Sequence, residues 1–229
     1  MENKIVVIIP AYNEENSIAK VIHDLPAKLV TEIIVVDNNS TDNTSNKAKR
    51  AGATVLFQQL KGYGNACLTG IEYLKNMKTP PAIVVFIDGD YSDYPEQLPV
   101  VIKPIIEEDY DMVIGSRNLG LKAKGSMMPQ QVLGNKLATT LMKWLYKTNY
   151  TDLGPFRAIK YKSLIALNMA DKNYGWTVEM QLKAAKLKMK TCEVAVDYRK
   201  RIGVSKVSGT VKGTLGAGYK IITTIFRYI

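Results

Sequence analysis

Short apolar runs, rich in β-branched residues, recur through the first half of the chain and are bounded by Pro, Asp, Asn or Gly. Continuous runs of this length are typical of strands buried on both faces of a parallel sheet. Stretches long enough for helices lie between them, and this alternation predicts a doubly wound α/β fold with helices on both faces of the sheet. The expected strands are 5–9, 33–36, 83–87 and 112–114, with 54–57 as a weaker fifth, and the expected helices are 15–25, 43–51, 64–77 and 96–108.

The second half of the chain changes in character. An amphipathic helix is expected over 134–147, because Leu137, Leu141 and Leu145 share one helical face. The segment TDLGPFRAI then predicts a loop, WTVEMQLKAAKL predicts a helix, and CEVAVDYRKR alternates as a late strand does.

The last 19 residues, 211–229, carry apolar residues at spacings of three and four, with Lys212, Lys220 and Arg227 roughly opposite. We therefore predict an amphipathic C-terminal helix, separate from a main domain over 1–210. Such a helix either docks on its own domain or lies in a membrane interface, and the two are compatible. No apolar run approaches the roughly 20 residues of a spanning helix, so any membrane association is expected to be peripheral.

Composition narrows the class of protein. The 229 residues include 31 Lys and Arg against 21 Asp and Glu, and the net charge of +10 favours an anionic partner without choosing among nucleic acid, phosphorylated metabolites and acidic membranes. A hydrophobic content of 46% excludes extensive disorder. Cys67 and Cys192 suggest neither a disulfide framework nor a four-ligand zinc site, which favours a reducing compartment.

Polar clusters follow three of the predicted strands: PAYNEEN, DNNSTDNT and DGDYSDYP. Because ligands of such sheets bind beyond the carboxyl ends of the strands, the clusters are expected to converge at one edge. Asp88 and Asp90, two residues apart at a strand end, can hold a hard divalent cation that takes its other ligands from water and substrate phosphates. The alternative is a turn rich in helix-capping residues, which an isolated D-x-D pair would not exclude.

Taken together, PAYNEE, VVDNNSTDNT, KGYGNA, FIDGDYSDYP, GSR and DLGPFRAI resemble the inverting family 2 glycosyltransferases of the GT-A fold. Within that family the sequence is most similar to the polyprenyl-phosphate sugar synthases, the dolichyl-phosphate mannosyltransferase-like group. The similar segments cover nearly the whole chain, and they occur in the same order as in the family. The resemblance implies a metal-dependent transfer of a hexose from a GDP- or UDP-linked donor, and a catalytic domain over 1–210.

The resemblance also implies which residues form the site. Asp88 and Asp90 would bind Mg²⁺ or Mn²⁺, with Ser92 completing the shell directly or through water. Asp37 would hydrogen-bond the base, with Asn39 nearby, and the glycines of KGYG allow close approach of backbone to a ligand. The implied nucleotide-sugar residues are Pro10, Ala11, Tyr12, Asn13, Glu14, Asp37, Asn39, Lys61, Gly62, Asp88 and Gly89.

The acid pair that serves many family members as general base is missing, and the corresponding segment contains Glu179 in a W-x-x-E setting. A phosphate acceptor needs no base, because a phosphomonoester is largely dianionic at neutral pH. Such a site needs cations instead. By resemblance we expect Asp90, Arg117 and Glu179 to be catalytic, although an ion pair on a helix face is as good an interpretation of Glu179. The expected phosphate-binding residues are Arg117, Arg157, Arg199, Arg201, Ser205 and Lys206.

The expected partners are a nucleotide-sugar donor, a lipid phosphate acceptor, and a membrane surface or membrane protein at the cytoplasmic face of a membrane. The basic, amphipathic surface fits anionic headgroups. One alternative is transfer to a glycan or other hydroxyl acceptor. A second is a binding module for nucleotides or nucleic acid without catalytic activity; the acidic clusters argue against it, and no nucleic acid is expected.

Overall fold

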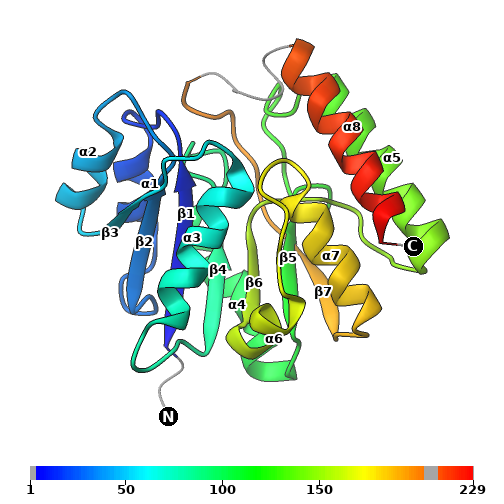
Figure 1. Cartoon of the computed structure of the whole chain (residues 1–229), viewed down its shortest axis with the longest axis horizontal. Coiled ribbons are helices and arrows are strands. Elements are labelled where there is room, and N and C mark those ends of the chain that lie inside the picture. Colours follow the sequence, from blue (N-terminus) through cyan, green and yellow to red (C-terminus); the bar gives the residue numbers. More distant parts are fainter. Residues whose placement is uncertain (1–3, 204–210, 229) are drawn as a thin grey trace.

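A seven-stranded sheet forms the centre of residues 4–203 and 211–228, which this computed structural model describes. The strand order is β3-β2-β1-β4-β6-β5-β7, and all neighbours pair in parallel except β6, which is antiparallel to β4 and β5 (Figure 1). The strands are β1 Ile5–Ala11, β2 Glu32–Asp37, β3 Thr54–Phe57, β4 Ile83–Phe86, β5 Met112–Ser116, β6 Arg157–Lys160 and β7 Thr191–Ala195.

Helices cover both faces of the sheet, because successive strand residues point to opposite faces and both sets are apolar. One face packs against α1 (Ile18–Asp24), α2 (Thr44–Arg50) and α4 (Leu98–Glu108), which follows a 3₁₀ turn at Pro95–Gln97. The other packs against α3 (Tyr63–Lys75), α5 (Pro129–Tyr146), α6 (Tyr161–Leu167), α7 (Trp176–Lys186) and α8 (Val211–Arg227). The predicted doubly wound α/β class is confirmed.

The strand register brings the polar clusters together as predicted. Ala11 at the end of β1 pairs with Asp37 at the end of β2, and Ile8 pairs with Phe86 at the end of β4. The segments that follow these three strands therefore leave the same edge of the sheet. This edge is where a binding site of such a fold is expected.

Two elements of the second half were not predicted. The segment expected to be a loop contains β6, and α6 follows it directly. Strand β6 has only four residues and begins with a buried arginine, Arg157, so it lacks the apolar run that marks the other central strands. The late strand, β7, covers only the first part of its predicted segment and ends at Ala195, and the remaining helices lie close to their predicted ranges.

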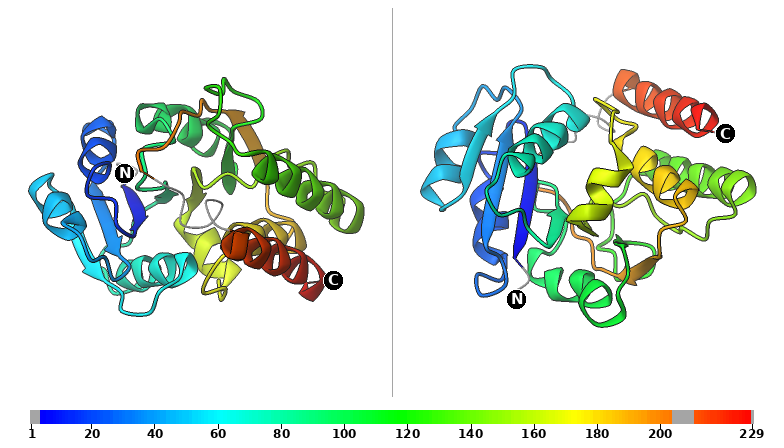
Figure 2. Two further views of the ribbon diagram at one scale, coloured as in Figure 1. Left: turned by 90° about the horizontal axis from the view of Figure 1, so that it is seen from above. Right: turned by 60° about the horizontal axis from the view of Figure 1, so that its bottom comes forward.

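The C-terminal helix α8 lies beside α5 and packs against both α5 and α7 (Figures 1 and 2). Ile225 is fully buried in this contact, and the Tyr146 hydroxyl donates a hydrogen bond to the Ile225 carbonyl oxygen. Docking on its own domain, one of the two predicted arrangements, is therefore observed. Among the described residues, none of the helices has the length and apolarity needed to cross a bilayer.

Candidate active site

A cavity of about 590 Å³ opens at the carboxyl edge of the sheet. Its wall is formed by the segments after β1 and β4, the first turn of α3, α5, the segment 173–177 and α8. Eleven of the predicted site residues line it. They are Pro10, Ala11, Tyr12, Glu14, Lys61, Gly62, Asp88, Gly89, Asp90, Arg117 and Arg201.

The two carboxylates of the D-x-D pair differ in their surroundings. Asp90 is 4% exposed, and its Oδ1 accepts hydrogen bonds from the Ser92 backbone N–H at 2.9 Å and hydroxyl at 2.5 Å. Its Oδ2 lies 2.9 Å from the Arg201 guanidinium. Asp88 has a buried Oδ1 without a hydrogen-bond partner among the described residues. Burial, followed by the charge of Asp90, raises the pKa of Asp88 to about 7.

These residues fit a divalent cation. A buried, unpartnered carboxylate oxygen beside a second carboxylate is an incomplete set of hard oxygen ligands, which is the arrangement that leaves room for waters and substrate phosphates. The described residues contain no group of three or more His, Cys, Asp and Glu side chains that could form a complete cage. Ser92 does not line the cavity and holds Asp90 in place, so we assign it an orienting task rather than a ligand position.

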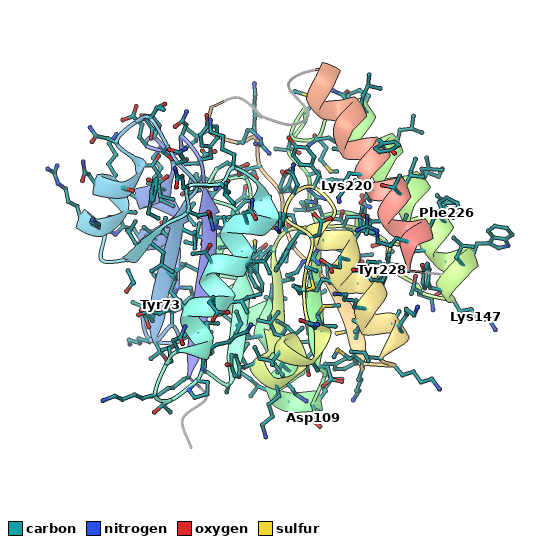
Figure 3. The ribbon with its side chains drawn as sticks, viewed as in Figure 1. Tyr73, Asp109, Lys147, Lys220, Phe226 and Tyr228 are labelled. Atoms are coloured by element: carbon teal, nitrogen blue, oxygen red, sulfur yellow. The ribbon has the colours of Figure 1, made fainter. Side chains whose placement is uncertain are left out.

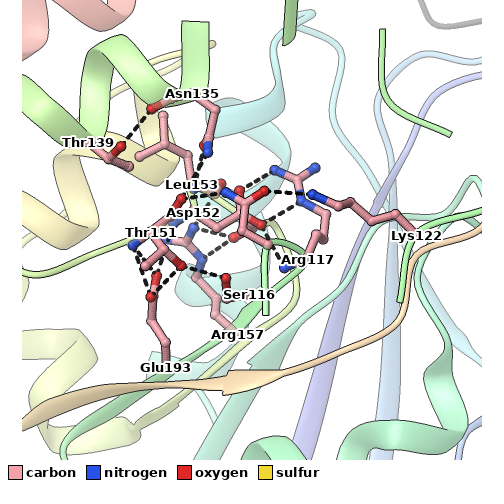
Figure 4. Close-up of polar contacts among 12 residues, drawn as sticks. Ser116, Arg117, Lys122, Asn135, Thr139, Thr151, Asp152, Leu153, Arg157 and Glu193 are labelled. Carbon is pink, nitrogen blue, oxygen red and sulfur yellow. Dashed lines mark hydrogen bonds and ion pairs between the residues drawn. The ribbon is translucent and has the colours of Figure 1, made fainter. Parts of the chain in front are cut away.

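Arg117 is fixed at the cavity wall by Asp152 (Figure 4). Its Nε and Nη2 donate to the two carboxylate oxygens at 2.7 and 2.6 Å, and its backbone N–H donates to the same group at 2.8 Å. Burial lowers the pKa of Arg117, but the Asp152 carboxylate outweighs it and the net pKa is raised. The result is a permanently charged, rigid guanidinium with its remaining edge available to a phosphate.

The glycine loop before α3 is held by Asn38, a cavity residue that the sequence analysis did not select. The Asn38 side chain accepts from the Gly62 N–H at 2.7 Å and donates to the Leu60 carbonyl oxygen at 2.7 Å. Gly62 has φ +140°, a conformation that side chains disfavour. Lys61 reaches across to the Tyr12 hydroxyl at 2.8 Å, so the loop and the segment after β1 meet over the cavity.

Asn13, Asp37 and Asn39 lie at the same edge but do not line the cavity. Asp37 accepts hydrogen bonds from the Ser40 N–H and the Ser45 hydroxyl, and Asn13 accepts one from the Thr41 N–H at 2.8 Å. Both side chains therefore stabilise the loop after β2. The expected hydrogen bond between Asp37 and the base, and the expected nucleotide contacts of Asn13 and Asn39, stay predictions.

Arg157 does not lie where a phosphate could reach it. Its side chain is fully buried, does not line the cavity, and donates to the carbonyl oxygens of Leu153, Gly154 and Thr177. Because those donors are already used, we correct the expected phosphate-binding task of Arg157 to a structural one.

Arg157→Leu is expected to destabilise the protein by about 2–4 kcal/mol, because it leaves buried carbonyl oxygens without donors. Urea unfolding followed by circular dichroism measures this loss. A variant of unchanged stability that has lost only phosphate affinity would contradict the structural assignment.

Arg199 and Glu179 also lie outside the cavity lining. The Arg199 guanidinium stacks between the rings of Tyr91 and Tyr94, 3.4 and 4.2 Å from their centroids, and donates to the Tyr91 carbonyl oxygen. Glu179 is fully buried and pairs with Lys183 one helical turn away at 2.7 Å, which agrees with the ion-pair interpretation. Neither geometry supports the expected catalytic or phosphate-binding task. Ser205 and Lys206 lie outside the described residues.

The remaining wall of the cavity comes from elements that carry no recognisable motif. Helix α5 and the segment before it supply Met127, Gln130, Gln131 and Asn135, and α8 supplies Gly218 and Ile221. Asn173 and Tyr174 come from the loop before α7. Only the topology, which brings the start of α5 and the middle of α8 to the strand ends, identifies them.

The chain resembles known proteins over most of its length. The family described as glycosyl transferase family 2 matches residues 6–167. An uncharacterised glycosyltransferase of Mycobacterium tuberculosis is 31% identical over 216 residues, which are 92% of this chain and 93% of that protein. An undecaprenyl-phosphate mannosyltransferase of Micrococcus luteus is 28% identical over 92% of this chain and 90% of that protein.

Solved structures show the same fold. Glucosyl-3-phosphoglycerate synthase from Mycobacterium tuberculosis, in complex with Mn²⁺, uridine diphosphate and glucosyl-3-phosphoglycerate, superposes with a TM-score of 0.77. The match covers 99% of this chain and 80% of that chain at 22% identity. At this identity the match supports the architecture alone.

Proposed function

The chain belongs to glycosyl transferase family 2 and has the GT-A fold, and we propose that it transfers a hexose, with inversion, from a GDP- or UDP-linked donor to a polyprenyl phosphate. One observation carries the proposal. A single cavity brings the Asp88–Asp90 pair and the guanidinium groups of Arg117 and Arg201 together with a wall from α5 and α8, in which polar Gln130, Gln131 and Asn135 lie beside apolar Ala217 and Ile221.

The donor side of the cavity suits a nucleoside diphosphate. Asp88 and Asp90 would hold Mg²⁺ or Mn²⁺, which when bound stabilises the negative charge of the departing diphosphate. Arg201, now paired with Asp90, lies at the same place and supplies a second positive charge to that diphosphate. Tyr12, Lys61 and the Gly62 backbone line the region next to the pair, where the resemblance places the nucleotide.

The acceptor side favours a phosphate over a hydroxyl group. The carboxylates that line the cavity, within the described residues, are Glu14, Asp88 and Asp90. Two of them serve the cation, and Glu14 already accepts a hydrogen bond from the Ser17 hydroxyl at 2.9 Å. With Glu179 buried elsewhere, a general base for a hydroxyl acceptor is missing from this wall, whereas Arg117 offers a fixed cation to a phosphate nucleophile.

An apolar surface next to the cavity suits a polyprenyl chain. Helices α5 and α8 both contribute to the cavity wall and expose large apolar side chains, among them Leu133 at 70%, Trp144 at 78% and Leu215 at 69%. Exposed lysines such as Lys136 and Lys143 lie between Leu133 and Trp144 along α5. A surface of this kind inserts apolar side chains between lipids while its cations contact anionic headgroups, which supports the proposed location at the cytoplasmic face of a membrane.

The test is a matrix of donors and acceptors. The purified protein is incubated with Mn²⁺ and GDP- or UDP-linked hexoses, each without acceptor, with a short polyprenyl phosphate, with 3-phosphoglycerate, and with simple sugars. We expect nucleoside diphosphate release to rise most with the polyprenyl phosphate. Faster release with a sugar would favour the hydroxyl-acceptor alternative, and no release under any combination would overturn the proposed transfer.

A further inference from the structure

Glu179 connects its own helix, α7, to the loop before that helix and to the end of α8, although it does not line the cavity. Its buried carboxylate accepts hydrogen bonds from the backbone N–H groups of Ala170 and Asp171, the latter at 2.7 Å. It also accepts a hydrogen bond at 2.7 Å from the hydroxyl of Tyr228, the residue that directly follows α8. Burial, and then this hydrogen bond, raise the pKa of Tyr228, so the hydroxyl keeps its proton at neutral pH. One carboxylate therefore ties the end of α8 to the loop before α7.

Asp171 makes a second connection between the same two elements. It is 8% exposed and accepts hydrogen bonds from the N–H groups of Asn173 and Gly175 at 2.8 and 3.1 Å. Its Oδ2 lies 3.0 Å from the Lys220 ammonium group, two turns before Tyr228 on α8. Figure 3 shows Lys220 on α8 and Tyr228 at its end, on the side of α7. The loop 170–175 thus depends on α8 at two points.

The loop 170–175 is also in direct contact with the glycine loop, residues 61–64, on the donor side of the cavity. The Asn65 N–H donates to the Lys172 carbonyl oxygen at 3.0 Å. A Cβ added to Gly62 would lie 2.2 Å from that oxygen, and one added to Gly64 would lie 2.0 Å from the Asp171 carbonyl oxygen. There is no room for a side chain on either glycine, so the position of one loop fixes the position of the other.

We propose that Glu179 and Asp171 are positioning residues for the donor site, and that through them α8 sets the geometry of the glycine loop at Lys61 and Gly62. The inference rests on the proposed nucleotide-sugar donor. It makes the C-terminal helix part of the donor site as well as a wall of the acceptor side. A disturbance of α8 therefore weakens nucleotide affinity.

Tyr228→Phe tests the coupling because it removes one hydroxyl and keeps the ring. Affinity for GDP and for UDP is measured by calorimetry with Mn²⁺, and backbone hydrogen exchange is measured over the segment that contains Asn65. We expect the nucleotide that the wild type binds to bind about threefold to tenfold more weakly, since the buried carboxylate loses one of its donors. Exchange at Asn65 should rise while exchange in β1 stays unchanged.

Tyr219→Phe is the matched control: it makes the same chemical change on α8, nine residues before Tyr228, at a side chain that is 73% exposed. It should leave affinity and exchange unchanged. Lys220→Met tests the Asp171 connection and should weaken binding, whereas Lys220→Arg should restore it. A Tyr228→Phe protein that matches Tyr219→Phe in either affinity or exchange overturns the inference, whereas a wild type that binds neither nucleotide overturns the proposed donor.

Discussion

Asp90→Asn is expected to lower the rate of hexose transfer by about 10³-fold, with the fold retained. The amide cannot supply the negative oxygen that a divalent cation and Arg201 both require. Because Ser92 holds the Oδ1 of Asp90 through two hydrogen bonds, the substituted side chain keeps its place and the loss reports on charge. The measurement is the initial rate of nucleoside diphosphate release with saturating donor, acceptor and Mn²⁺.

Two further variants make this result specific. Asp109→Asn, whose side chain is 92% exposed at the opposite edge of the sheet, should keep the full rate. Ser92→Ala, which leaves the Asp90 carboxylate intact but removes its hydroxyl donor, should lose about 10- to 100-fold. An Asp90→Asn enzyme with the wild-type rate would remove the cation from the proposed function.

The first half of the fold could be predicted from the sequence because each central parallel strand is a continuous apolar run that ends in a polar cluster. The register then places the ends of β1 and β2 side by side, with Ala11 opposite Asp37. Strand β6 could not be predicted in the same way. It enters the sheet antiparallel through a short segment after Gly154 and Pro155, and only its pairing with β4 and β5 shows that it is a strand.

The residues of the candidate site also differ in whether the sequence could predict them. Local motifs identified the side chains that directly follow a strand, including Asp88 and Asp90, because their place depends mainly on that strand. Whether an arginine faces a ligand or a carbonyl oxygen depends on distant packing. Arg117 and Arg157 each follow a short segment that contains a glycine, GS and GPF. Asp152 nevertheless holds Arg117 at the cavity wall, whereas Arg157 is buried and donates to three carbonyl oxygens.

Glu179 shows why such errors arise. Its position one turn before Lys183 agreed with an ion pair and with a catalytic base, and both interpretations consider only α7. The contacts that decide its task come from Tyr228, 49 residues away, and from the loop before the helix. Sequence spacing contains no information about a contact between elements whose packing is set by the whole sheet.

Asp88→Asn is expected to act in opposite directions on rate and stability. It removes a ligand of the proposed cation, so the transfer rate falls by about 10³-fold. In the metal-free protein, however, burial and the Asp90 charge raise the pKa of Asp88 to about 7, above the unfolded value of about 3.9. The folded state therefore binds the proton more tightly, and stability is lost as pH rises from about 4 to about 7. The amide of the Asp88→Asn variant does not ionise, so the variant avoids this loss of stability.

At pH 8 the Asp88→Asn protein should be more stable by about 1–2 kcal/mol, which raises the melting temperature by about 2–8 °C for a chain of this size. Thermal unfolding in the presence of a chelator measures the difference. At pH 5 the stability difference between the variant and the wild type should fall to about a third of its value at pH 8, because the folded wild type is then protonated at Asp88. Adding Mn²⁺ and the nucleoside diphosphate should raise the melting temperature of the wild type and leave that of the variant nearly unchanged. A variant that melts below the wild type at pH 8 without metal would mean that the ionised Asp88 is stabilised by its neighbours, and that the pair is not held ready for a cation.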